Sequence, residues 1–273
     1  MKQVSREAMS RGQIIGLVPT MGALHEGHAS LVRASKGQCQ ATAVSIFVNP
    51  LQFGPTEDLA KYPRTLDRDS KLLEALGVDL LFLPTVEEMY PTGATTHVEV
   101  GGLSDRLDGL SRPGHFRGVA TVVAKLFEIV RPDRAFFGQK DAAQVAVLRR
   151  MVRDLDMDVQ LVVCPIVREP DGLAMSSRNA YLNPDERKRA LVLQRALLRV
   201  LHEADQGEHD VAKLIAVGES VIAEDPAARL DYFAMVDPDS LEPVSDLSRG
   251  ALIAVAAYVG TTRLIDNLLL ASR

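Results

Sequence analysis

Short apolar runs rich in β-branched residues alternate with segments of helical periodicity along the first 163 residues. The runs typical of buried strands lie at 13–18, 41–48, 79–83, 134–137 and 159–163. The segments with apolar residues at helical spacing lie at 29–36, 66–76, 118–130 and 142–155. Strands that alternate with helices pair in parallel, with helices covering the sheet. We therefore predict an α/β fold, a Rossmann-like parallel sheet with helices on both faces.

The pattern changes after residue 163. Residues 165–179 are polar, contain a Pro-Asp-Gly turn and show no clear periodicity, which is typical of a linker. Asn183 and Pro184 then form a strong helix start for a pattern that runs to about Glu203. A further helix is expected at 211–222, and strands are expected at 229–236, 251–258 and 262–266. We predict two domains, residues 1–167 and a smaller α+β domain at 168–273.

The composition describes an ordinary globular chain. Its 273 residues are 47% hydrophobic, enough for a substantial core, and its net charge of −5 offers no general attraction to nucleic acid or to an anionic membrane. No window approaches the roughly 18 apolar residues of a membrane span. Cys39 and Cys164 lie among apolar neighbours, so we expect buried thiols and a cytoplasmic protein without nucleic-acid or membrane partners.

The stretch PTMGALHEGH, residues 19–28, follows the first predicted strand. Ligands of parallel sheets bind at the carboxyl ends of strands, where helix N-termini present free N–H groups. Gly22 and Gly27 would let the backbone approach a ligand, and His25 and His28 would share one face of the starting helix. This arrangement suits a nucleoside triphosphate. The alternative is a capped turn with two exposed histidines.

Two further segments carry phosphate-binding chemistry. FFGQKDAAQ, residues 136–144, leads from a strand end to Lys140, and AMSSRN, residues 174–179, offers two hydroxyls and an arginine. Each segment alone has a plainer interpretation, an exposed lysine or a serine-rich loop. Neither a Walker A sequence nor a G-x-G-x-x-G fingerprint is present, so a P-loop ATPase or an ordinary dinucleotide oxidoreductase is disfavoured.

The three segments in this order resemble the nucleotidylyltransferase superfamily, with His25-Glu26-Gly27-His28 as its HIGH-type motif and Met175-Ser176-Ser177-Arg178 as its KMSKS-type loop. The chain is similar in more detail to the pantoate-beta-alanine ligase family. That resemblance is carried by VPTMGALHEGH, SIFVNPLQFGPTEDLAKYPRT, RPGHFRGVATVV, FFGQKD, REPDGLAMSSRN and YFAMVDP, which together span essentially the whole chain.

The resemblance implies that ATP and pantoate form pantoyl adenylate and pyrophosphate, and that beta-alanine then displaces AMP to give pantothenate. It implies a catalytic set of His28, His25, Lys140, Ser176, Ser177 and Arg178, in which His28 protonates the leaving pyrophosphate. The implied ATP-binding residues are Met21, Gly22, Ala23, Leu24, His25, Glu26, Gly27, His28, Gly138, Gln139, Lys140, Asp141, Val167, Met175, Ser176, Ser177 and Arg178.

The resemblance also implies the contacts of the smaller ligands. Gln52 and Gln144 match glutamines that contact pantoate, and Gln52 is also placed to touch beta-alanine. Tyr62 and Arg64 match a segment that closes over the site, and Arg112 matches a contact to the second substrate or to a partner subunit. For Mg²⁺, which prefers oxygen ligands, Asp69 is the expected carboxylate, with Asp67 and Asp141 as alternatives. A homodimer is expected, and the 176–179 loop with the smaller domain is expected to act as a lid.

Two departures from the family pattern have structural implications. The chain begins only about a dozen residues before the first strand, which implies a misassigned start or an uncovered sheet edge. Ala143 replaces a glutamine that the family generally has, which implies a looser helix start or a lost contact behind the ligands.

Three other functions remain as alternatives. A class I aminoacyl-tRNA synthetase fragment would need a basic RNA-binding surface. Another nucleotidylyltransferase would need a second phosphate site, and an ATP-sensing regulator would bind ATP without turnover. The acceptor that triggers pyrophosphate release distinguishes them.

Overall fold

The first part of the chain forms one parallel sheet in a computed structural model that describes residues 1–273 except Thr56, Asp58 and Arg273. Its five strands are ordered β3-β2-β1-β4-β5 and pair in parallel throughout. They span β1 (Ile15–Thr20), β2 (Ala41–Ile46), β3 (Leu80–Phe82), β4 (Arg134–Gly138) and β5 (Gln160–Cys164). The predicted α/β class is confirmed.

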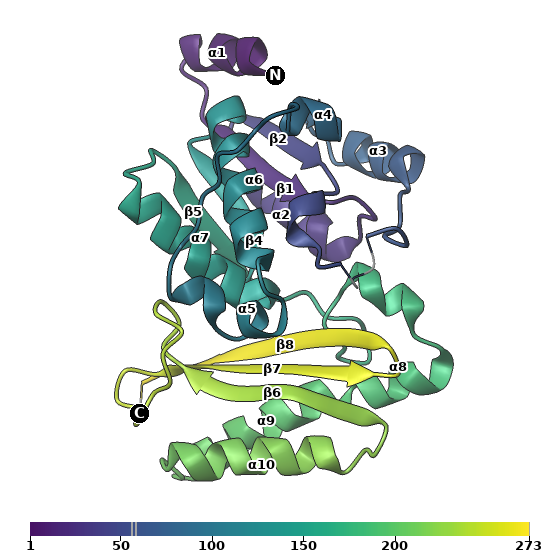
Figure 1. Ribbon diagram of the computed structural model, residues 1–273, viewed down its shortest axis with the longest axis vertical. Helices are drawn as coiled ribbons and strands as arrows, with labels where there is room; N and C mark the ends of the chain where they lie inside the picture. Colours follow the sequence, from purple (N-terminus) through teal and green to yellow (C-terminus); the bar gives the residue numbers. More distant parts are fainter. Residues whose placement is uncertain (56, 58, 273) are drawn as a thin grey trace.

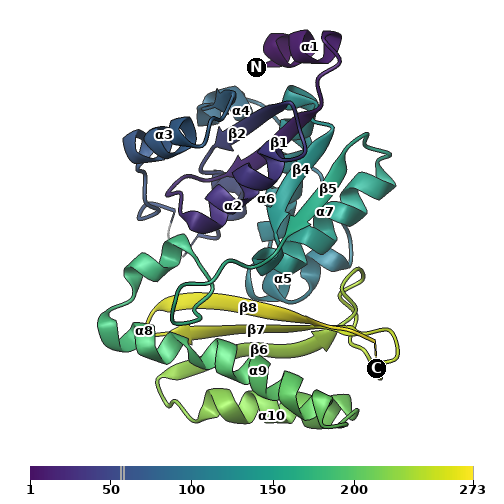
Figure 2. The ribbon, with the colours of Figure 1, turned by 180° about the vertical axis from the view of Figure 1, so that it is seen from behind.

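Helices cover both faces of this sheet (Figures 1 and 2). One core contains α2 (Glu26–Lys36) and α3 (Leu66–Ala75), and the other contains α1 (Lys2–Ser10), α6 (His115–Val130) and α7 (Ala142–Asp154). Successive β1 residues serve opposite cores, Leu17 on the α6 side and Val18 on the α2 side, as the period of a strand requires. Helix α2 lies very close to β1 at Gly16, where a Cβ would be 2.1 Å from the Ser35 hydroxyl.

Shorter helices lie within the connections. They are the α-helices α4 (Val86–Met89) and α5 (Asp108–Ser111) and the 3₁₀ turns η1 (Pro50–Gln52), η2 (Leu103–Asp105), η3 (Gln139–Asp141) and η4 (Ser177–Tyr181). Three of these turns carry or flank predicted site residues.

The rest of the chain builds an antiparallel sheet packed against two long helices. Its strands are β6 (Ala228–Val236), β7 (Ala251–Val259) and β8 (Thr262–Leu270), and its helices are α8 (Pro184–Ala190), α9 (Val192–Asp205) and α10 (Val211–Ala223). Ile253 and Val255 of β7 pack in the core with α9 and α10, whereas Leu252 and Ala254 join the core of the first unit. The small sheet therefore lies between its own helices and the parallel-sheet unit (Figure 1).

Several predicted boundaries are wrong. Helix α2 begins at Glu26 rather than Ala29, and α6 begins at His115 rather than Gly118. The single helix expected from Pro184 to about Glu203 is divided at Leu191 into α8 and α9. Strand β8 continues past Asp266 to Leu270 because Asp266 and Asn267 are buried with hydrogen-bond partners instead of ending the strand at the surface. Helix α1 was not predicted.

Two local expectations are confirmed. Asn183 caps α8 by accepting from the Asp185 and Glu186 N–H groups, and Cys39 and Cys164 are free and buried. Ala143, the departure from the family pattern, is buried in the core of α6 and α7, and its expected effect on the helix start stays a prediction. Within the described residues, no helix combines the length and apolar character needed to cross a membrane.

Candidate active site

The first site segment is the loop between β1 and α2, and α3 determines its shape. Gly22 and Ala23 have positive φ values of 86° and 51°, a conformation that costs energy for alanine. The carboxylate of Asp69, which is 1% exposed, accepts from the N–H of Ala23 and of Leu24, both at 2.9 Å, and from the Thr65 hydroxyl at 3.1 Å. Asp69 thus holds the loop in its strained conformation.

His25 and His28 form a reciprocal cap at the start of α2. His25 Nδ1 accepts from the Gly27 N–H at 3.1 Å, and His28 Nδ1 accepts from the His25 N–H at 3.3 Å. An Nδ1 atom that accepts leaves the hydrogen of a neutral ring on Nε2. Both side chains therefore present an Nε2–H donor. His25 precedes the helix as its N-cap, which corrects the expectation that both histidines lie on a helical face.

Both rings are held in the neutral state. Burial, followed by the charge of Lys140, lowers the pKa of His25 to about 4. Burial, followed by His25 and Lys140, lowers the pKa of His28 to about 3. The ring centroids are 4.2 Å apart, so a proton on one ring would repel a proton on the other. At neutral pH the site offers two uncharged donors beside one lysine.

The second segment, η3, continues from the end of β4 and carries Lys140. The Lys140 ammonium is 4.0 Å from the Asp141 carboxylate, and both residues line the space above the strand ends. Gln139, expected near ATP, instead directs its amide to Asn267 of β8 at 3.0 Å.

The third segment, residues 168–178, is shaped mainly by hydrogen bonds within itself. Arg168 and Ala174 form a β-bridge, and the Met175 N–H donates to the Val167 carbonyl at 3.0 Å. The Ser176 hydroxyl caps η4 by accepting from the Arg178 N–H, and the Ser177 hydroxyl lies 3.4 Å from that of Tyr62. The loop is therefore shaped by its own backbone, with Tyr62 closing one side.

Two adjoining cavities lie among these segments. The smaller, about 180 Å³, is lined by the predicted residues Met21, His25, Gly27, His28, Tyr62, Gly138, Lys140, Asp141, Gln144, Val167, Met175, Ser176, Ser177 and Arg178, and by six more. The larger, about 860 Å³, lies between the two units and shares Lys140, Asp141, Gln144, Ser176 and Arg178 with the smaller. Residues more than 150 positions apart in the sequence therefore line one continuous site.

Some predicted residues lie behind or outside these cavities. Leu24 is 2% exposed and packs in the core, and Glu26 pairs with Arg33 on the surface. Gln52 donates to the Met21 sulfur and accepts from the Asn49 amide, so it supports Met21 without lining either cavity. Arg64 is exposed and lines neither.

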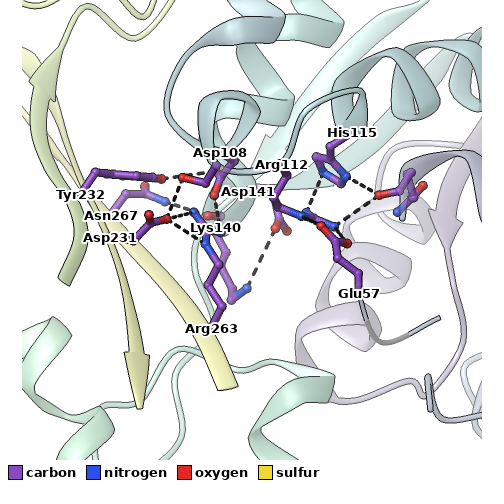
Figure 3. Close-up of polar contacts among 12 residues, drawn as sticks. Glu57, Asp108, Arg112, His115, Lys140, Asp141, Asp231, Tyr232, Arg263 and Asn267 are labelled. Carbon is purple, nitrogen blue, oxygen red and sulfur yellow. Dashed lines mark hydrogen bonds and ion pairs between the residues drawn. The ribbon is translucent and has the colours of Figure 1, made fainter. Parts of the chain in front are cut away.

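Arg112 lines the larger cavity and belongs to a network with Glu57 and His115 that was not predicted from the sequence. It makes a bidentate ion pair with Glu57, at 2.8 and 2.7 Å, and its second terminal nitrogen lies 2.9 Å from His115 Nε2 (Figure 3). Burial, followed by the charge of Arg112, lowers the pKa of His115 to about 4, so the ring is neutral. Because a carbonyl oxygen only accepts, the His115 Nδ1–H donates to the Gln52 carbonyl at 2.8 Å. His115 lies three residues after Arg112 in the segment RPGHF, and this spacing was the sequence signal for the contact between them.

The protein oxygens do not form a ready-made cation site. Among the described residues, no group of three or more His, Cys, Asp or Glu side chains is arranged to hold a metal ion. Both oxygens of Asp69 already accept from the loop and from Thr65, so its expected contact with Mg²⁺ stays a prediction.

Comparison with known proteins matches the chain to one family. The model of the pantoate-beta-alanine ligase family matches residues 1–269. The chain belongs to the pantoate-beta-alanine ligase family. It is 68% identical over 256 residues to the pantothenate synthetase of Acidobacterium capsulatum, covering 94% of this chain and 86% of that protein.

Solved structures of the family share the fold. The crystal structure of pantothenate synthetase from Thermus thermophilus matches with a TM-score of 0.93 and 51% identity over 98% of each chain. The pantoate-beta-alanine ligase of Francisella tularensis, complexed with beta-gamma ATP and beta-alanine, matches with a TM-score of 0.79 and 36% identity over 98% of this chain and 95% of that chain. The chain is thus an enzyme of the ligase class.

Proposed function

We propose that this ligase condenses pantoate with beta-alanine through a pantoyl-adenylate intermediate. A pantoate carboxylate oxygen attacks the α-phosphorus of ATP, and the bond to pyrophosphate breaks. The amine of beta-alanine then attacks the acyl carbon, loses a proton, and displaces AMP to leave an amide.

One observation carries this proposal: the convergence of His25, His28, Lys140 and the 175–178 loop on one cavity. A carboxylate is already a nucleophile, so adenylate formation needs no general base. It needs alignment and stabilisation of the charge that builds on the phosphates. Two neutral Nε2–H donors, an ammonium group, two hydroxyls and a guanidinium supply these requirements.

The capping geometry prepares the two histidines for this task. Because their Nδ1 atoms are occupied by backbone N–H groups, their Nε2–H groups are directed without reorganisation during the reaction. We propose that both donate to phosphate oxygens and that His28 assists the leaving pyrophosphate. Because the pKa of His28 is lowered to about 3, its ring is neutral, and it assists as an Nε2–H hydrogen-bond donor that stays uncharged.

Mg²⁺ would accompany ATP and neutralise part of the phosphate charge. Since the described part of the chain lacks a cluster of carboxylates, phosphate and water oxygens would supply most of its ligands. Asp141, whose side chain is half exposed beside Lys140, fits a contact through water.

The larger cavity fits the second half-reaction. Arg112 and Glu57 line it as a bidentate ion pair, with side chains 17% and 22% exposed. We propose that the carboxylate of beta-alanine binds near Arg112, and that the smaller unit and the 176–179 loop form a lid that keeps water from the adenylate. The homodimer and the cytoplasmic location stay predictions.

Pyrophosphate release from ATP with Mg²⁺ tests the function directly. We expect a stoichiometric burst with pantoate alone and turnover only after beta-alanine is added. His28→Ala should lower the burst rate by roughly 10²–10³-fold, because one preorganised donor is lost. His209→Ala, at an exposed histidine on the smaller unit, is the matched control and should behave as wild type.

The same assay separates the alternatives. Release that starts with another carboxylate but not with pantoate would remove the assigned substrate. ATP binding without pyrophosphate release from any acceptor would favour the ATP-sensing regulator.

A further inference from the structure

Asn267 of β8 joins the smaller unit to the segment that carries Lys140. Its Nδ2 donates to the carbonyls of Gln139 and Lys140 at 3.0 and 2.9 Å, and its Oδ1 accepts from Gln139 Nε2 at 3.0 Å. Because carbonyl oxygens only accept, the orientation of the Asn267 amide is determined by its partners. With 4% of its surface exposed, Asn267 directs both N–H donors and its oxygen to η3.

Side-chain caps do not add to this support of the η3 backbone. Neither η3 nor α7, which follows it, has a side-chain cap at its start. Gly138, which precedes η3, is the last residue of β4 and pairs with Cys164 of β5, so the regular sheet pairing ends directly before η3. Lysine has a long flexible side chain, so the placement of its ammonium depends on where its backbone is held.

The neighbouring residue of β8 contacts the other phosphate-binding segment. Asp266 accepts from both terminal nitrogens of Arg168, at 2.7 and 3.0 Å, and Arg168 also donates to the Gly172 carbonyl. Arg168 forms a bridge with Ala174, which directly precedes the 175–178 loop. Consecutive residues on opposite faces of β8 thus hold the two segments on either side of the smaller cavity.

We propose that Asn267 is a positioning residue for ATP, acting through the backbone of Lys140. The smaller unit then does more than cover the site: docking of β8 completes the phosphate-binding arrangement. This inference rests on the proposed function, because it assigns Lys140 to the ATP phosphates.

Asn267→Ala tests the proposal by removing all three hydrogen bonds. We expect kcat/KM for ATP to fall roughly 10- to 100-fold, as for a displaced binding group, with KM for pantoate unchanged. The matched control is Arg106→Ala, which removes two other bonds between the units, to the Ser240 carbonyl and to Glu242, away from both cavities. Arg106→Ala should retain wild-type kinetics.

A double-mutant cycle gives a readout that a merely structural role would not produce. If Asn267 acts through Lys140, Asn267→Ala should cause less than about a twofold further loss in a Lys140→Ala enzyme. A full additional loss in that background would overturn the proposal, as would wild-type kcat/KM for ATP in Asn267→Ala.

Asn267→Asp provides a second variant if the alanine variant folds poorly. The carboxylate keeps the size of the side chain and an acceptor for Gln139, but it has no N–H for the two carbonyls. It should weaken ATP binding, measured by calorimetry, by a similar factor, and wild-type affinity would overturn the proposal. Calorimetry on the wild type also distinguishes a failure of the proposed function from a failure of the role given to Asn267. If the wild type bound ATP but released no pyrophosphate with pantoate, only the proposed function would be contradicted.

Discussion

At the residue scale, the lowered pKa values of His25 and His28 make stability depend on pH. The unfolded chain takes up these protons near the usual pKa of 6.5, whereas the folded chain does so only at about 4 for His25 and about 3 for His28. The stability that comes from keeping these two rings neutral is therefore fully present above pH 6.5. It is lost as the pH falls from 6.5 towards the folded-state pKa values of about 4 for His25 and about 3 for His28. His28→Gln keeps an acceptor for the His25 N–H, but its side chain cannot gain a proton. When the pH is lowered from about 7 to about 4.5, the unfolding free energy of the wild type should therefore fall by about 2 kcal/mol more than that of the variant. Urea unfolding at both pH values measures this difference, and equal losses would contradict it.

At the element scale, α3 maintains the shape of the loop that leads into α2. Asp69→Asn leaves one acceptor for the N–H groups of Ala23 and Leu24 and brings an amide close to two donors. We expect the unfolding free energy without ligands to fall by about 1–3 kcal/mol and KM for ATP to rise. Asp67→Asn, an exposed substitution in the same helical turn, is the control and should cost no more than about 0.5 kcal/mol. If Asp69→Asn changed only the Mg²⁺ requirement and left stability intact, the carboxylate would be a metal contact and not the support of the loop.

At the scale of the whole molecule, Arg263 joins the two units through a buried ion-pair network. It donates to Asp108 of α5 at 2.7 Å and to Asp231 of β6 at 2.9 and 2.7 Å, and the Tyr232 hydroxyl lies 3.3 Å from Asp108 (Figure 3). Arg263→Met leaves two largely buried carboxylates without a cationic partner, so we expect the unfolding free energy to fall by about 3–5 kcal/mol. Arg149→Ala, which breaks an exposed ion pair with Asp239, should lower it by only about 0–1 kcal/mol. Small-angle scattering of wild type with ATP and pantoate should show compaction, as the proposed lid requires. A scattering profile unchanged by both ligands would contradict the lid.

Residues whose surroundings are formed by nearby sequence could be predicted as site residues, whereas residues whose partners lie far along the chain could not. Four predicted site residues follow strand ends or lie in a turn-rich linker, so short stretches of sequence were enough to predict a shared phosphate site. The structure places all four on one cavity: His25, His28, Lys140 and Ser176. Asp69 was assigned to a metal from its match to the family, whereas its burial and its bonds to a loop more than 40 residues away became visible only in three dimensions. The predicted strand ends at Asp266 and leaves Asn267 outside it, because a polar pair within an apolar run has no local signal for a buried partner.

The sequence by itself determined the order of the strands and of most long helices. It also determined that the first sheet is parallel and which segments meet at its carboxyl edge. These follow from side-chain periodicity and from the geometry of parallel strands, both of which act over a few residues. Only the tertiary structure decided which side chains complete the site: the contacts of Asn267 with the Lys140 segment, the Asp69 support of the histidine loop and the ion pairs of Arg263. Those contacts join residues 32 to 155 positions apart. They exist because burying each polar group would be costly without a partner, and the docking of separate elements supplies that partner.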